Sequence, residues 1–302
     1  MQNKYNMTLE ENIFLAKRNI IDSIWKSAQL EGIAVTFPDT EAIYNGINVP
    51  TVKVDDIIAI NNLKHAWQFT LDTLDYPFDY AYLCKLHQYI GSNLIYGAGK
   101  IRTIPVTIGG TSWKPDFPIE SVIKDEIQKV LEIPNATERA ITMALYGMRK
   151  QIFLDGNKRV SMLAANQIMV SNGAGILAVP VEKQPEFTRL LISYYETNKM
   201  DEVKGFLYEN CIDGFAFEHS PKEYTERLKK ELEDAHFRPT NKLVENMQNL
   251  RDLMGKTIPL KEIAILYKNT EALGEETGKC IRIIGDELKR QELEREFVEI
   301  LP

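Results

Sequence analysis

The chain has 302 residues, enough for about two domains, and its 44% hydrophobic and 26% charged residues are ordinary for a globular protein. Its net charge of −7 disfavours a general nucleic-acid binder, which usually carries a basic surplus. The three cysteines are far apart and form no metal-ligand spacing, and no apolar run is long enough to cross a bilayer. We therefore expect a cytoplasmic protein with reduced thiols and no membrane partner.

The N-terminal part predicts one helix over residues 8–31. Thr8 and Glu11 fit a capping box, apolar residues recur at helical spacing, and Gly32 is a suitable stop. A loop containing Pro38 and Asp39 should follow. Further helices are expected over residues 54–74 and 79–90.

Residues 92–118 have a different pattern. Glycines at positions 97, 99, 109 and 110 surround an apolar run from Ile101 to Ile108. Pro105 lacks a backbone donor, which argues against a central strand and favours an edge hairpin. Such an edge can accept an added peptide strand. An incidental surface loop is the alternative.

Helical patterns resume after this segment, over residues 119–131, 137–150, 157–171, 187–197 and 201–210, with a short extended piece at 176–179. Beyond Gly214 the chain becomes strongly charged, with further helical patterns over 224–237, 241–254, 258–269 and 280–300. Their mixed charges are typical of solvated helix faces. Partner binding or dimerisation is the expected role, ahead of a DNA-binding helix pair, because there is no basic surplus.

The most informative stretch runs from Gln151 to Arg159. Hydrophobic periodicity resumes directly after it, so the sequence Asp155-Gly156-Asn157-Lys158 should form a turn that opens a helix. Glycine permits the bend, and the free amides of a helix N-terminus form an anion site. The alternative is an ordinary turn with solvated basic residues and no binding function.

The longer string resembles the signature of Fic-domain proteins, His-x-Phe-x-Asp/Glu-Gly-Asn-Gly/Lys-Arg. Phe153 and residues 155–159 match it in order, whereas Gln151 stands where the family has histidine. Lys158 is similar to the Doc branch, which is associated with phosphate transfer rather than AMP transfer. Met162 stands where many Fic proteins have a second arginine.

Two further blocks strengthen this resemblance, in the family's order. Residues 27–32, Ser-Ala-Gln-Leu-Glu-Gly, resemble the inhibitory Ser/Thr-x-x-x-Glu-Gly motif. Residues 99–102 and 106–110, with Pro115, resemble the flap, a β-hairpin that holds a target segment beside the nucleotide.

The resemblance implies an all-α fold: a Fic-type helical core with a small β-hairpin flap and helical extensions at both ends. We expect an N-terminal region with the inhibitory-type helix over residues 1–58. The Fic core should span 59–215, and a C-terminal helical appendage 216–302.

It also implies roles for individual residues, with ATP and Mg²⁺ as cofactors. Asp155 would bind the metal, and Gly156, Asn157, Lys158 and Arg159 would bind phosphates. Ser27 and Glu31 would be inhibitory. Arg102, Ile104, Val106 and Ile108 would dock an unidentified target protein, and a second copy of the chain is a further candidate partner.

The glutamine at position 151 leaves the activity open. A Fic-type transfer moves AMP or phosphate from ATP to a target hydroxyl, whose proton the family's histidine accepts. An amide has no useful basicity, and losing a general base costs about 10²–10⁴ in rate. We therefore expect a nucleotide-dependent protein modifier whose transfer step is weakened or abolished, although substrate positioning alone could allow slow phosphoryl transfer. A non-catalytic nucleotide-binding regulator and a protein-interaction module are the alternatives.

Another histidine could instead supply the base. His65, His87, His219 and His236 are the histidines of the chain. For His87, which falls on the third predicted helix, we expect a packed structural role.

Overall fold

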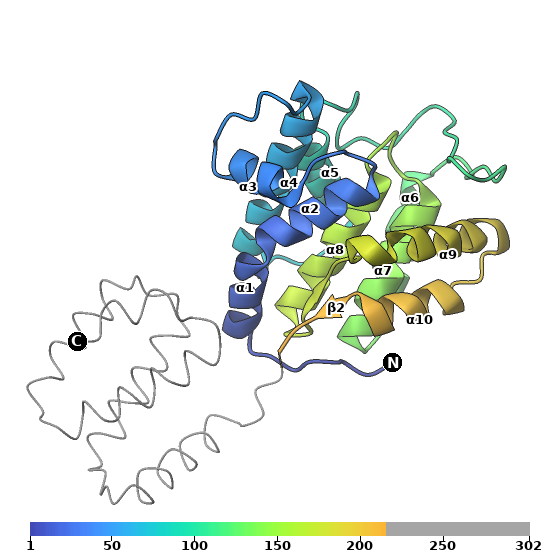
Figure 1. Ribbon diagram of the computed structural model, residues 1–302. Helices are drawn as coiled ribbons and strands as arrows, with labels where there is room; N and C mark the ends of the chain where they lie inside the picture. Colours follow the sequence, from blue (N-terminus) through green and yellow to red (C-terminus); the bar gives the residue numbers. More distant parts are fainter. Residues whose placement is uncertain (216–302) are drawn as a thin grey trace, which may run out of the picture. The chain divides into compact units, whose positions relative to one another are not determined.

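A computed structural model describes residues 1–215 of the chain (Figure 1). The chain divides into two compact units, Met1–Ala216 and Phe217–Pro302. The appendage expected over residues 216–302, with its helices, therefore lies outside the described residues, as do His219 and His236. Within residues 1–215, no helix combines the length and hydrophobicity needed to span a bilayer.

The described unit is built almost entirely from helices, as expected. Its ten α-helices are α1 (Leu9–Arg18), α2 (Ile20–Leu30), α3 (Phe37–Tyr44), α4 (Val54–Asp72), α5 (Tyr80–Ile90), α6 (Glu120–Leu131), α7 (Ala136–Lys150), α8 (Asn157–Ser171), α9 (Gln184–Thr197) and α10 (Asp201–Asn210). A short 3₁₀ turn, η1 (Val181–Lys183), precedes α9.

The first helix differs from its prediction, because it is broken at Asn19 into α1 and α2 (Figure 1). Asn19 leaves the helical region, with φ −98° and ψ 11°, and its side chain donates to the carbonyl of Leu15. An asparagine side chain can satisfy helix-end backbone groups in this way. The capping box at Thr8 and Glu11 is present.

The loop expected around Pro38 is in fact a short helix, α3. Thr36 and Asp39 form a second capping box, and Pro38 lies in the first turn, where its missing N–H costs nothing. The proline was therefore a helix-start signal and not a loop signal.

The flap segment does not form the predicted β-hairpin. The strands of the described unit are β1 (Ile176–Leu177) and β2 (Ile212–Asp213), which pair antiparallel, whereas residues 101–118 contain no strand. Pro105 removes one ladder donor, and the guanidinium of Arg102 takes the carbonyls of Ile104 and Asp116 that a ladder would use. The segment is an extended loop.

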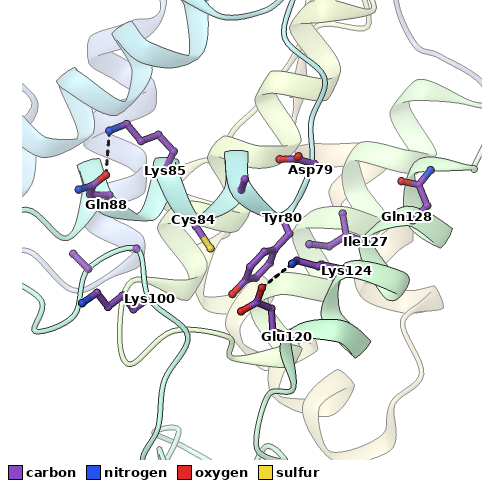
Figure 2. Close-up of a pocket in the computed structure, with 13 residues that line it drawn as sticks. Asp79, Tyr80, Cys84, Lys85, Gln88, Lys100, Glu120, Lys124, Ile127 and Gln128 are labelled. Carbon is purple, nitrogen blue, oxygen red and sulfur yellow. Dashed lines mark hydrogen bonds and ion pairs between the residues drawn. The ribbon is translucent and has the colours of Figure 1, made fainter.

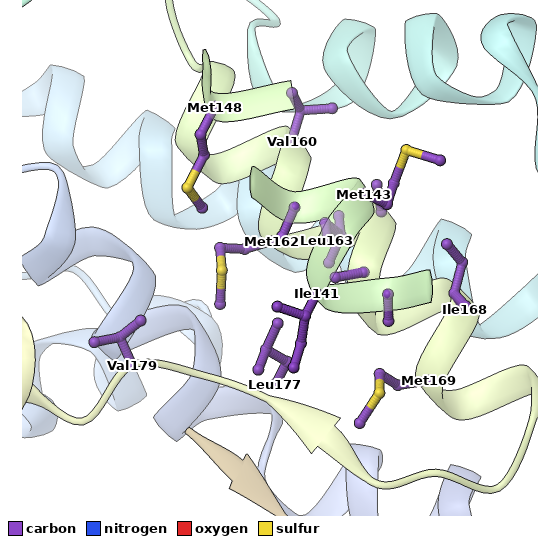
Figure 3. Packing of buried hydrophobic residues seen from close by; sticks show 14 of the residues in the cluster. Ile141, Met143, Met148, Val160, Met162, Leu163, Ile168, Met169, Leu177 and Val179 are labelled. Carbon is purple, nitrogen blue, oxygen red and sulfur yellow. The ribbon is translucent and has the colours of Figure 1, made fainter. Parts of the chain in front are cut away.

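Helix α8 lies at the centre of the core. All of its residues except Lys158 and Ser171 are buried, which is typical of a helix enclosed on every side. Figure 3 shows Met148 of α7 beside Val160 and Met162 of α8, together with Leu177 and Val179. Helices α7 and α8 pack closely along one another, so the loop between them is anchored at both ends.

The close approach of α7 and α8 can be tested at Gly147. A Cβ there would lie 2.3 Å from Oγ and 3.2 Å from Cβ of Ser161, whereas a Cβ at Gly205 of α10 would meet nothing within 4 Å. Gly205→Ala should raise the free energy of unfolding by about 0.5–1 kcal/mol through helix propensity. Gly147→Ala should lower it by about 1–3 kcal/mol through overpacking. Urea unfolding of both variants measures the difference, and equal effects would contradict this packing.

Candidate functional site

The segment that joins α7 to α8 is a tight bend with two residues in the left-handed region. Gln151 follows α7 with φ 51° and ψ 57°, and Gly156 precedes α8 with φ 73°. A Cβ at Gly156 would lie 3.1 Å from Cδ1 of Ile95 and 3.5 Å from Nε2 of His87. Both the backbone conformation and the close neighbours therefore favour glycine at this position.

The N-terminus of α8 has the form of an anion site. Within residues 1–215, the backbone N–H groups of Gly156, Asn157 and Lys158 have no hydrogen-bond acceptor. These groups carry the positive end of the helix dipole. These N–H groups are the donors that the predicted anion site would use.

The side chain of Asn157 points into the loop and not towards a ligand. Its Oδ1 accepts the N–H of Phe153 at 3.0 Å, and its Nδ2 donates to the carbonyl of Phe153 at 2.8 Å. The same Nδ2 donates to Oε1 of Gln151 at 3.1 Å. Asn157, predicted to bind phosphate, has only its backbone amide left for that purpose.

Gln151 is tied into the same network. Its Nε2 donates to the carbonyl of Met148 at 2.6 Å, while its Oε1 accepts from Asn157. Its backbone carbonyl accepts Nε of Arg102 at 2.7 Å. The amide thus acts as a bridge between α7 and the loop.

Both cations in the first turn of α8, Lys158 and Arg159, face Glu31, which follows the last turn of α2. Lys158 Nζ lies 3.5 Å from Glu31 Oε2 and donates to the carbonyl of Leu30 at 2.9 Å. Arg159 Nε lies 3.6 Å from Glu31 Oε1. The side chains of Glu31 and Arg159 are 14% and 7% exposed, so water screens this pair only weakly.

The contact between Glu31 and Arg159 is incomplete. Oε1 of Glu31 and Nε of Arg159 are both buried and form no hydrogen bond. Unpaired buried polar atoms are costly. Lys158 and Arg159 therefore bind a carboxylate of the chain itself, and not with optimal geometry.

Asp155 presents the exposed carboxylate of the site. Its side chain is 66% exposed, and its Oδ2 lies 3.3 Å from Nη2 of Arg159. No group of three potential metal-ligating side chains occurs within residues 1–215. For the predicted Mg²⁺, Asp155 would supply one ligand, and water and phosphate oxygens would have to supply the others, as is usual for this ion.

The other predicted site residues have different surroundings. Ser27 is half-buried on α2, one turn before Glu31, and Met162 is buried on α8. In the flap, Ile104 is exposed, whereas Val106 and Ile108 are half-buried. Arg102 is buried, and its guanidinium donates to backbone carbonyls. Its backbone N–H donates to the carbonyl of Ile152 at 3.0 Å.

His87 of α5 contacts the loop on its buried side, and its buried position agrees with the structural role expected for it. Its Nδ1 accepts the N–H of Gly99 at 2.8 Å, so Nε2 carries the proton and donates to the carbonyl of Asp155 at 2.8 Å. The ring stacks on Phe153 with centroids 3.8 Å apart. Burial lowers the pKa of His87 from 6.5 to about 4, so the ring is neutral at physiological pH.

A separate cavity of about 720 Å³ lies between α5, α6 and residues 98–100 (Figure 2). It contains no residue of the signature loop. Its charged groups are partly paired, because Lys124 bridges to Glu120 at 2.7 Å and Lys85 donates to Gln88 at 3.0 Å. Of its lining residues, Gly99 and Lys100 belong to the flap-like motif, and no sequence motif marked the others.

Comparison with known proteins points to the same part of the chain. The Fic/DOC family matches residues 77–169 of the chain, which include the flap segment and the loop between α7 and α8. None of the curated proteins matches the chain.

Several solved structures share the fold at low sequence identity. A Fic domain containing signaling protein from Bacteroides thetaiotaomicron VPI-5482 superposes with a TM-score of 0.56 at 16% identity, covering 67% of this chain and 85% of that one. A fragment of Fic-1 from C. elegans gives 0.54 at 21% identity, covering 66% and 64%. A Fic family protein from Desulfovibrio desulfuricans G20 gives 0.54 at 14% identity, covering 80% and 71%.

The lowered pKa of His87 predicts how stability depends on pH. The unfolded chain binds a proton at His87 below about pH 6.5, whereas the folded chain resists it down to about pH 4. The His87 contribution is present above pH 6.5 and is lost as pH falls towards 4, by roughly 3 kcal/mol. Between about pH 6.5 and pH 4, the free energy of unfolding of His87→Gln, measured by urea unfolding, should fall by roughly 3 kcal/mol less than that of the native chain. His65→Gln, an exposed control, should follow the native chain, and equal slopes in all three would refute the prediction.

Proposed function

Because residues 77–169 belong to the Fic/DOC family, whose members in general modify proteins in a nucleotide-dependent way, we propose that this chain is a nucleotide-binding regulator with a lost or strongly weakened transfer step. The loop between α7 and α8 is the binding site in this proposal. ATP with Mg²⁺ is the ligand we infer for it.

The observation that carries the proposal is the state of Gln151. Both ends of its amide are engaged, with Met148 and with Asn157. An amide accepts no proton at physiological pH, and this one is also held in place by its hydrogen bonds. The position that would hold a general base therefore supports loop structure and not proton transfer.

The other histidines of the described unit do not replace the base. Both ring nitrogens of His87 are used, one by Gly99 and one by Asp155. Its low pKa also makes it a weak base. His65 is an exposed residue of α4, with no hydrogen bond to the loop.

The residues of the loop fit a polyphosphate. The amides from Gly156 to Lys158 are free, Lys158 and Arg159 already bind a carboxylate, and Asp155 offers an exposed oxygen. Phosphate binding depends on such amides and cations and needs no base. Bound MgATP would supply the polyphosphate and a transferable phosphoryl or adenylyl group.

Glu31 would then regulate the site by competition. Its carboxylate occupies the two cations that phosphate oxygens would need. Since the contact is incomplete on both sides, the cost of displacing Glu31 is limited. The chain would bind nucleotide only when the anion outcompetes its own carboxylate.

A slow protein modifier is the second candidate. Lys158 adds a cation beside the phosphates, and phosphoryl transfer passes through a loose transition state that demands little base assistance. The extended segment carrying Arg102, Ile104, Val106 and Ile108 would dock the target, whose hydroxyl would receive phosphate or AMP. Arg102 would act there through the backbone that it holds.

Replacing the glutamine by histidine tests both candidates. The native chain should bind MgATP, as seen by calorimetry, without modifying proteins of a cell lysate. Gln151→His should restore transfer by about 10²–10⁴-fold, detected by mass spectrometry with labelled ATP. Gln151→Asn is the control, because it also removes the bridge to Met148 without adding a base.

The outcomes separate the proposals. Transfer by the native chain at rates close to those of the histidine variant would favour the modifier. If neither the native chain nor Glu31→Gln binds MgATP, the nucleotide proposal fails and an interaction module is left.

Neutralising Glu31 tests its competition with nucleotide. Glu31→Gln keeps the shape of the side chain but removes the charge that faces Lys158 and Arg159. MgATP affinity should rise by about 5–30-fold, corresponding to about 1–2 kcal/mol for a lost charged contact. Glu41→Gln, at an exposed position of α3, should leave affinity unchanged. Equal affinity in all three proteins would show that Glu31 does not compete.

A further inference from the structure

His87 holds one peptide group of the phosphate loop in a fixed orientation. Its protonated Nε2 donates to the carbonyl of Asp155, and the ring is fully buried. The tautomer is set from the other side, because the N–H of Gly99 can only donate to Nδ1. A neutral imidazole is thus locked as an acceptor at one end and a donor at the other.

The orientation of this peptide matters for anion binding. A trans peptide is planar, and its C=O and N–H point in opposite directions. The carbonyl of Asp155 points inward to His87, so the N–H of Gly156 in the same peptide points away from the ring. That N–H has no acceptor within residues 1–215.

Packing reinforces the hydrogen bond. The imidazole lies on the Phe153 ring, 3.8 Å between centroids and 4° from parallel. A Cβ at Gly156 would lie 3.5 Å from Nε2, so the bend itself rests against the ring. Hydrogen bonding and stacking together leave the loop little freedom to rotate this peptide.

The second hydrogen bond of His87 reaches the segment that leads into the flap. Gly99 has φ 80°, and a Cβ there would lie 3.1 Å from the carbonyl of Cys84. Gly99 is the first residue of the flap-like motif, and Arg102, three residues later, binds the carbonyls of Gln151 and Ile152. One ring therefore links the start of the flap with the phosphate loop.

We propose that His87 is a positioning residue of this site: it turns the Asp155–Gly156 peptide so that the Gly156 amide faces a bound polyphosphate, and it couples that loop to the entrance of the flap. This inference rests on the proposed nucleotide binding. The charged groups that face the ring are Asp155 of the loop and Arg159 of the first turn of α8.

Two substitutions separate hydrogen bonding from packing. His87→Phe keeps an aromatic ring against Phe153 but removes both nitrogens. His87→Gln removes the ring but keeps one donor and one acceptor. His65→Phe makes the first change at an exposed site of α4 and is the matched control.

Binding of inorganic tripolyphosphate, measured by calorimetry at neutral pH, gives the first readout. His87→Phe should bind tripolyphosphate about tenfold or more weakly, because the Gly156 N–H would no longer donate a hydrogen bond to a charged phosphate oxygen. His87→Gln should recover most of the affinity, and His65→Phe should equal the native chain. Native affinity in a folded His87→Phe, or no recovery in a folded His87→Gln, would overturn the proposal.

Nitrogen-15 NMR gives a second readout that needs no ligand. The native imidazole should show a bare Nδ1 and a protonated Nε2, and His87→Phe should shift the Gly156 amide resonance strongly. If the native chain binds no polyphosphate, nucleotide binding fails while these spectra still decide the role of His87. A Gly156 resonance that does not move in His87→Phe, or the opposite tautomer in the native chain, would refute the positioning role.

Discussion

The buried side chain of Asn157 holds the loop between α7 and α8 in one conformation. It binds the N–H and the carbonyl of Phe153 and also the amide of Gln151. Because both helices are anchored in the core, these hydrogen bonds of Asn157 fix the position of the free backbone amides in the first turn of α8. The proposed anion site would therefore depend on a polar network that is almost fully satisfied, the kind that rigidifies a structure.

The charges around this loop are balanced without a ligand. Glu31 neutralises part of the field of Lys158 and Arg159, and Asp155 lies on the outer side of Arg159. Such an arrangement gives the buried guanidinium of Arg159 an opposite charge. Under the proposed function, a polyphosphate would have to replace this carboxylate, so affinity and regulation would arise from the same contacts.

Much of the fold followed from the sequence, because amphipathic spacing and helix caps are local signals. The core helices from α4 to α10 lie close to their predicted bounds. Local signals failed where a residue type occurs in more than one structural context. Asn19 breaks a continuous apolar pattern through its own side chain, and Pro38 begins a helix.

The candidate site was predictable in composition but not in the direction of its side chains. Glycine at 156 and the cations at 158 and 159 are where the motif places them. Yet Asn157 and Arg102 turn inward, because each has donors that backbone carbonyls can satisfy as well as a ligand can. The hydrogen bonds of His87 join residues 68 and 12 positions apart, a pairing that only the folded chain brings together.

The most direct test is a titration of the chain with tripolyphosphate, followed through its backbone amide resonances. If the loop grips a polyphosphate, the largest shifts should fall on residues 156–159, with smaller ones at Glu31 as its carboxylate is displaced. Shifts confined to other regions, or none at concentrations that saturate Glu31→Gln, would contradict the account.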